Sequence, residues 1–146
     1  MGEVKREQFI KMIICAMDME DYKAEYVEFA DVPQGAWFEQ YVSIAKQNGL
    51  VSGMGNNMFG VGENITRQDM AVMLYNAMRK NGYTNSGAKN NFADSDACAD
   101  YATVAIAELA ALGVINGVGD DAFDPTATAT RAQAAVIINR ALEYLN

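Results

Sequence analysis

Three arginines stand at equivalent positions of the chain and are its strongest candidates for binding chemistry. Arg6, Arg67 and Arg131 each lie where a predicted helix begins. A cation in the first turn of a helix opposes the helix dipole, which favours acidic residues there. A guanidinium group can, however, hold a carboxylate through two parallel N–H donors, and nearby helix N–H groups add to the attraction. The pattern therefore predicts a site for an anionic group at these helix starts.

Two aromatic residues recur with the same spacing as the arginines. Tyr101 follows Trp37 at the same separation along the chain as Arg131 follows Arg67. Such rings can stack on the face of a sugar, although we expect packing in the core to be their main role. A structural alternative exists for the arginines as well. Each could form an ion pair with a neighbouring repeat, with the candidate partners Asp31, Asp94 and Glu63.

The residue composition excludes most catalytic chemistry. The chain has 146 residues and no histidine, which removes the commonest general base and most zinc and iron sites. No pair of carboxylates stands out for glycosidase chemistry. Cys15 lies in an apolar helical run, where we expect a core residue, and a disulfide with Cys98 remains open. The sequence thus predicts a protein that is not an enzyme and has neither a cofactor nor a metal site.

Charge and hydropathy limit the partners. The net charge is −8, which repels phosphate backbones, so nucleic acid is not an expected partner. No apolar run reaches the ~20 residues that a membrane-spanning helix needs, so no membrane insertion is expected. An anionic ligand would have to be held by a few well-placed cations.

The sequence repeats itself. When the chain is shifted along itself, Gly49–Phe59 falls on Gly113–Phe123, and a slightly different shift places residues 4–6 on residues 65–67. Each complete unit reads as a helix, a glycine-rich loop and a second helix, and a unit of this size cannot bury its apolar face alone. We therefore predict one all-α domain over residues 1–146, built from a partial repeat (1–28), a repeat with its linker (29–91) and a further repeat (92–146).

Helix-capping signals position the arginines. The first helix of the middle repeat is expected at about residues 37–48, and the second helices begin after Thr66 and Thr130. Both threonines open a capping box, in which Asp69 is a poorer third member than Gln133. The apolar stripes behind these starts are assigned to the core: Phe9, Ile10, Ile13, Ile14, Met17, Met70, Met73, Leu74, Ala77, Ala134, Ile137, Ile138 and Ala141.

The order of these patterns resembles the S-layer homology (SLH) family. The chain has Phe-Ala-Asp, a helix-opening aromatic residue, Gly-Leu-Val-x-Gly and Thr-Arg-x-Asp; the family reads Phe-x-Asp-Val, Trp-Ala, Gly-(Ile/Val)-x-Gly and Thr-Arg-Ala-Glu. The resemblance covers residues 29–80 and 92–144 and the second half of a copy at residues 4–17. It implies a bundle of helix-loop-helix repeats with pseudo-threefold symmetry.

The resemblance also implies a function and a location. Family members anchor bacterial surface proteins outside the cell by binding secondary cell-wall polysaccharide, which is often pyruvylated. Their motif arginine lies in a groove between repeats and meets the acidic sugar. Carried over by position, the implied ligand-binding residues are Arg67, Arg131, Arg6, Trp37, Tyr101, Gly53 and Gly117.

Departures from the family pattern support an alternative function. The first copy lacks the aromatic residue and the glycine loop, so one groove is expected to be incomplete. Tyr101 stands where tryptophan is usual, and Lys5 stands where threonine is usual. A bundle that has drifted in this way could instead dock another domain of its parent protein or a partner on the bacterial surface.

Overall fold

The computed structural model describes residues 2–145, and this part of the chain folds into five α-helices. They are α1 (Arg6–Ala16), α2 (Glu39–Gln47), α3 (Arg67–Lys80), α4 (Thr103–Ala111) and α5 (Arg131–Leu142), with the short 3₁₀ turns η1 (Ser95–Ala97) and η2 (Asp100–Ala102) ahead of α4. Residues 2–145 contain isolated β-bridges but no β-strand, which confirms the all-α prediction. None of these helices has the length and apolar character that crossing a membrane requires.

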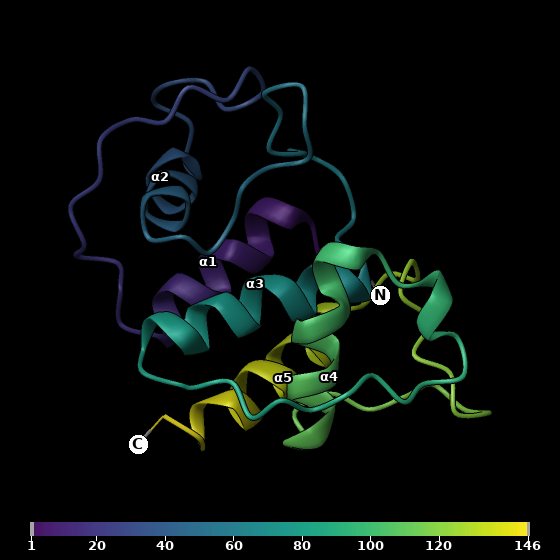
Figure 1. The fold of residues 1–146 in the computed structure, drawn as a ribbon. Helices are drawn as coiled ribbons and strands as arrows, with labels where there is room; N and C mark the ends of the chain where they lie inside the picture. Colours follow the sequence, from purple (N-terminus) through teal and green to yellow (C-terminus); the bar gives the residue numbers. More distant parts are fainter. Residues whose placement is uncertain (1, 146) are drawn as a thin grey trace.

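The second helices of the three copies form the centre of the molecule. Helices α1, α3 and α5 contact one another in pairs (Figure 1). Helix α2 packs on α1, and α4 packs on α3, so each outer helix covers the inner helix of the preceding copy. Helix α5 has no third outer helix in the described part of the chain, and its Val136 remains 45% exposed.

The inner helices meet through the apolar stripes that the sequence predicts. Nearly all of the stripe residues are buried, and the exception is Ile137, which is half-buried on the uncovered side of α5. Removing this apolar surface from water is the main force that holds the bundle together. The largest completely buried side chains include Phe9, Phe59, Phe123 and Leu74.

The segments that lead into the three inner helices are joined side by side. Their backbones form bridges between residues 3 and 130, 5 and 64, and 66 and 128. Direct hydrogen bonds run from Val4 N–H to Ala129 O and from Ile65 N–H to Val4 O, both at 3.0 Å. We call this meeting point of segments 3–5, 63–66 and 127–130 the apex. It sets the starts of all three inner helices, and hence the three arginines, at one end of the bundle.

Three sequence predictions for individual residues are wrong. Trp37 is 55% exposed and Tyr101 is 64% exposed, so neither ring packs mainly in the core. Both residues precede the first residue of an outer α-helix, Tyr101 within η2, where the side chain can turn outward. Cys15 is exposed because it lies beside the buried stripe of α1 rather than in it; it and the buried Cys98 are free thiols.

The polar linker after α3 is tied to α4 by one buried carboxylate. Glu108 accepts hydrogen bonds from Tyr83 O–H (2.7 Å), Ser86 N–H (2.8 Å) and Ala88 N–H (2.9 Å), and from the Ser86 hydroxyl (3.0 Å). Burial alone would raise the pKa of Glu108, but these donors stabilise the anion and lower it to about 2. The linker is therefore held against the bundle although it contains no helix.

Candidate functional site

The aspartates of the Phe-Ala-Asp segments shape the loops that face the arginines. Asp31 accepts hydrogen bonds from the N–H groups of Phe59 (2.8 Å), Gly60 (2.7 Å) and Val61 (2.7 Å). Burial opposes ionisation of Asp31, but the three N–H donors outweigh it and lower the pKa of the carboxyl group. Asp94 caps the corresponding loop of the last repeat through the N–H groups of residues 123 and 124, both at 2.8 Å.

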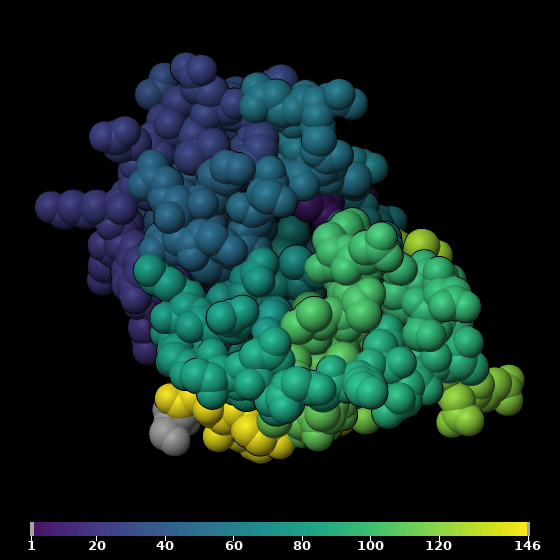
Figure 2. Space-filling view, viewed as in Figure 1, coloured from purple at the N-terminus to yellow at the C-terminus, as the bar shows by residue number. Residues whose placement is uncertain are grey.

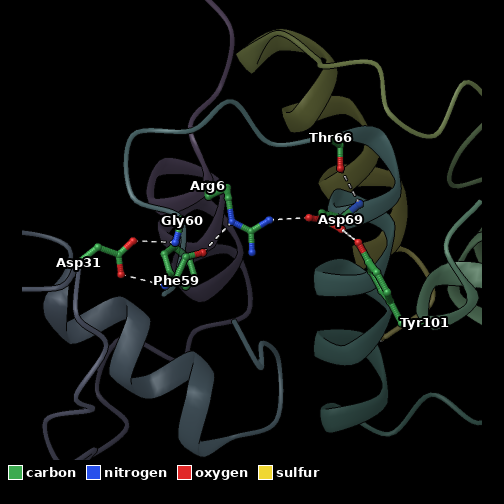
Figure 3. Close-up of polar contacts among 7 residues, drawn as sticks. All are labelled: Arg6, Asp31, Phe59, Gly60, Thr66, Asp69 and Tyr101. Atoms are coloured by element: carbon green, nitrogen blue, oxygen red, sulfur yellow. Dashed lines mark hydrogen bonds and ion pairs between the residues drawn. The ribbon is translucent and has the colours of Figure 1, made fainter. Parts of the chain in front are cut away.

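Arg6 lies against the loop that Asp31 holds. Its Nε donates to Phe59 O at 2.9 Å, and its guanidinium lies 5.3 Å from the centre of the Phe59 ring. Its Nη1 forms a 2.6 Å ion pair with Oδ2 of Asp69, on the next inner helix (Figure 3). Among residues 2–145 this is the one ion pair, so the predicted partners Asp31, Asp94 and Glu63 are not the ones used.

Arg67 repeats this arrangement one copy later, but without a carboxylate. Its Nε donates to Phe123 O at 2.8 Å, its Nη2 donates to Asn116 O at 2.7 Å, and its guanidinium lies 4.6 Å from the centre of the Phe123 ring. Burial lowers the pKa of Arg67, while the nearby Asp124 and Asp94 act against that shift. We call Arg67 with Asn116 and Phe123 the Arg67 site.

The backbone at the start of α3 is not available to a ligand. Arg67 N–H donates to Ala127 O at 2.8 Å, and Gln68 N–H donates to Pro125 O at 3.0 Å. The sequence suggested that helix N–H groups would help to attract an anion. At α3 these two groups are already satisfied by the neighbouring repeat, so any attraction must come from the arginine side chain.

Asp69 connects the arginine of the first copy to the aromatic residue of the last. Its Oδ1 accepts a 2.6 Å hydrogen bond from the Tyr101 hydroxyl, while Oδ2 holds Arg6 (Figure 3). Burial raises the pKa of Tyr101, the hydrogen bond to Asp69 raises it further, and the result is about 12. The hydroxyl thus stays protonated and keeps donating to the carboxylate.

The weaker capping box releases Asp69 for this role. Gln8 and Gln133, at the same position of α1 and α5, accept a hydrogen bond from the N-cap residue of their own helix, at 2.9 and 3.0 Å. Thr66 caps the backbone N–H of Asp69 at 3.3 Å, but the structure shows no return bond from the shorter Asp69 side chain. The third position of the box was the signal in the sequence that could have identified Asp69.

A pocket of about 430 Å³ opens between the three repeats at this network. We call it the Arg6 pocket; it is lined by Arg6, Leu50, Val51, Ser52, Gly53, Met54, Asp69, Val72, Met73 and Tyr101. Figure 2 shows a hollow on this face between the loop drawn in blue-green and the green segment near residue 101. The first copy thus contributes an arginine, the second a loop and a helix face, and the third an exposed aromatic ring.

Glycines allow the loops to approach their neighbours closely. A Cβ atom on Gly53 would lie 2.8 Å from the Phe29 ring, and one on Gly117 would lie 3.0 Å from the Phe92 ring. A Cβ atom on Gly60 would lie 2.8 Å from Cδ of Arg6. The first two glycines therefore support the loops, whereas Gly60, which the sequence analysis did not single out, makes room for the arginine.

Four of the seven predicted site residues lie outside the lining of the Arg6 pocket: Arg67, Gly117, Arg131 and Trp37. Arg131 is exposed, and residues 2–145 offer its side chain no hydrogen bond or ion pair. Trp37 lies by α1, where Lys11 Nζ is 5.6 Å from the centre of its ring. Trp37 thus has the same place relative to α1 as Tyr101 has relative to α3.

Comparison with known proteins agrees with the repeat. A family model described as the S-layer homology domain matches residues 28–71 and 91–135, together more than half of the chain. The chain is 35% identical to an exoglucanase XynX of Acetivibrio thermocellus, over 98% of this chain and 13% of that protein. It is 34% identical to an amylopullulanase of Thermoanaerobacterium thermosulfurigenes, over 96% of this chain and 8% of that protein.

A further relative is named as an anchoring protein. The chain is 28% identical to a cellulosome-anchoring protein of Acetivibrio thermocellus, over 83% of this chain and 27% of that protein. The chain spans only a small part of each of these relatives. The match and the relatives place it among the extracellular domains of bacterial cell-surface proteins, and they support a non-catalytic role in cell-wall anchoring. The chain belongs to the S-layer homology domain family.

Proposed function

We propose that this domain anchors its parent protein to the bacterial cell wall by binding secondary cell-wall polysaccharide at the Arg6 pocket and the Arg67 site. The observation that carries the proposal is the Arg6 pocket itself. Its volume of about 430 Å³ lies in the range of small-molecule sites and suits a sugar unit. It combines an exposed Tyr101 ring, which can stack on a sugar face, with the polar groups of Arg6 and Asp69.

The Arg67 site supplies the contact for an acidic group of the polymer. Two donors of its guanidinium are satisfied by Phe123 O and Asn116 O, which fix the orientation of the group. No hydrogen bond within residues 2–145 occupies its Nη1, and no carboxylate pairs with it. A guanidinium held in this way is prepared to bind a carboxylate such as that of a pyruvyl group.

The pocket favours binding over hydrolysis of the polymer. Glycoside hydrolysis normally uses two carboxyl groups on opposite sides of the scissile bond. Asp69 is the one acid among the residues that line the Arg6 pocket, and it is already engaged with Arg6 and Tyr101. The bound polysaccharide would therefore be held and not cleaved.

Sedimentation with purified cell wall tests the proposal. The wild-type domain is expected to sediment with the wall, and the double variant Y101A/R67A is expected to remain in solution, with at least roughly tenfold weaker binding. R79A is the matched control, because Arg79 lies exposed at the end of α3 and belongs to neither site. Far-UV circular dichroism must show that both variants are folded.

Arg131 is tested separately because its side chain has no hydrogen-bond or ion-pair partner among residues 2–145. We expect R131A to weaken sedimentation less than R67A does, since an exposed arginine without a positioned partner adds mainly long-range attraction. Failure of the wild-type domain to sediment with any wall preparation would contradict the proposed function. It would favour docking to another protein domain instead.

A further inference from the structure

We infer that the two arginine sites differ in the charge of the sugar that they bind: the Arg6 pocket takes an uncharged sugar unit and the Arg67 site takes an anionic one. Asp69 makes the difference. The inference rests on the proposed function and specifies which part of the polysaccharide each site binds.

The charges of the Arg6 pocket already cancel. Arg6 and Asp69 are the charged residues of its lining, and their side chains are 5% and 16% exposed. Their ion pair is short, at 2.6 Å, and Asp69 is held at its second oxygen by Tyr101. A sugar carboxylate entering the pocket would meet the negative charge of Asp69 where water screens it poorly.

A rearrangement that admits an anion is unfavourable. To bind Arg6 through Nη1, a ligand carboxylate would have to displace Asp69 from both the guanidinium and the Tyr101 hydroxyl. Breaking a buried ion pair leaves one charge without a partner in a poorly hydrated place, which is strongly disfavoured. The pocket therefore discriminates against an acidic unit by repulsion as well as by the lack of a free cation.

An uncharged sugar meets complementary groups in the same pocket. Its hydroxyl groups can donate to the oxygens of Asp69 and accept from Nη2 of Arg6, for which residues 2–145 provide no hydrogen-bond partner. Its apolar face can stack on the ring of Tyr101. The remaining wall of the pocket is largely apolar, as is usual in a ligand site: Leu50, Val51, Val72 and Met73.

The Arg67 site lacks the carboxylate that neutralises Arg6, because Gln133 stands where the preceding helix has Asp69. Gln133 occupies the place in α5 that Asp69 occupies in α3, and its side chain is bound back to the N-cap of its own helix at 3.0 Å. Asp94 is directed to the backbone of its own loop, and Asp124 forms no ion pair with a described residue. Asp124 and Asp94 lie near enough to act on Arg67, but neither forms an ion pair with it, so its Nη1 remains open to a ligand.

Two reciprocal substitutions test this inference. D69N removes the negative charge from the Arg6 pocket with little change in shape, and Q133D introduces one at the exposed equivalent position of α5. The probes are two forms of one purified wall polysaccharide fragment, with its pyruvyl groups and after their removal, and the measurement is isothermal titration calorimetry. We expect D69N to shift the ratio of the two affinities roughly tenfold toward the pyruvylated form, and Q133D to shift it roughly tenfold away.

Y101F is the control for the loss of a hydrogen bond without loss of charge. It removes the donor to Asp69 but keeps the carboxylate, so we expect weaker binding of both fragments with an unchanged ratio. Q133D keeps the test decisive even where D69N lowers stability, because Gln133 lies at the surface. An unchanged ratio in both D69N and Q133D, with wild-type binding of the fragments intact, would overturn the inference. A wild-type domain that binds neither fragment would instead overturn the proposed function and this inference with it.

Discussion

Gly60 shows how one residue without a side chain positions the arginine of the pocket. Its φ angle is +99°, in a region that other residues rarely adopt, and an added Cβ would clash with Sδ of Met54 and would meet Cδ and Nε of Arg6 at 2.8 Å. The equivalent residue of the next copy, Asp124, also has a positive φ, of 61°. The chain therefore needs the same turn twice, but it needs the additional space only beside Arg6.

A comparison of two neighbouring glycines separates these two effects. Gly62 has a φ angle of +86° and free space around its Cα, so G62A is expected to cost only the backbone strain, about 1 kcal/mol. G60A adds the clashes with Met54 and Arg6 and is expected to lower the free energy of unfolding by about 2–4 kcal/mol. Urea denaturation of both variants measures the difference, and equal losses would show that the close contacts with Met54 and Arg6 do not limit the turn.

The site was predictable from the sequence as far as the repeat could show it. The arginines and aromatic residues were visible because they recur at fixed spacing. Asp69 was visible only as a weak capping residue, and its partner across the repeats, Arg6, depends on tertiary packing. Gly60 gave no signal because its counterpart in the other copy is Asp124.

At the scale of elements, the helices were more predictable than the segments between them. Helix α2 begins two residues after the predicted start, while α3 and α5 start directly after their predicted threonine caps. Residues 18–28, which follow α1, form no helix. The segment is instead held by side chains of α2. Gln40 Nε2 donates a hydrogen bond to Glu20 O at 3.0 Å, and Gln47 Nε2 donates one to Glu25 O at 2.9 Å.

Glu108 makes the linker an element whose stability depends on pH. Its pKa in the folded protein is about 2, below the ordinary value of 4.5, so it stabilises the fold above pH 4.5. That contribution is lost as the pH falls from 4.5 toward 2. We expect E108Q to lower the free energy of unfolding at pH 7 by about 1–3 kcal/mol, because its amide cannot accept all of the linker hydrogen bonds.

Urea denaturation at several pH values measures both effects. The wild-type stability should fall more steeply than that of E108Q between pH 4.5 and 2, so the two curves approach each other in acid. E143Q provides the control, since Glu143 is exposed at the end of α5. Parallel curves for wild type and E108Q would show that the linker carboxylate does not carry the acid sensitivity.

At the scale of the whole molecule, the repeats share one core. Inner helices from all three copies contact one another, and the apex bonds join segments of every copy. The sequence indicated this sharing, because a single unit has too little apolar surface to fold alone. It could not show that each outer helix covers the inner helix of the preceding copy, so that within residues 2–145 one side of α5 stays uncovered.

A shared core predicts cooperative unfolding. Trp37 is the single tryptophan and reports on the region of α1 and α2, whereas far-UV circular dichroism reports on all helices. We expect urea transitions from the two signals to have the same midpoint and the same slope. A separate, earlier tryptophan transition would show that the first half of the molecule unfolds on its own.

The bond from Val4 to Ala129 at the apex joins residues that are far apart along the chain. Such a contact closes a loop of almost the entire sequence, and its entropic cost must be met before the contact contributes. During synthesis the first segment can pair with segment 63–66 once the middle repeat has emerged, whereas its second apex partner, segment 127–130, follows only with the last repeat. A chain interrupted before the last repeat leaves the apolar stripe of α1 in contact with α3 but without α5, the second of its two inner neighbours.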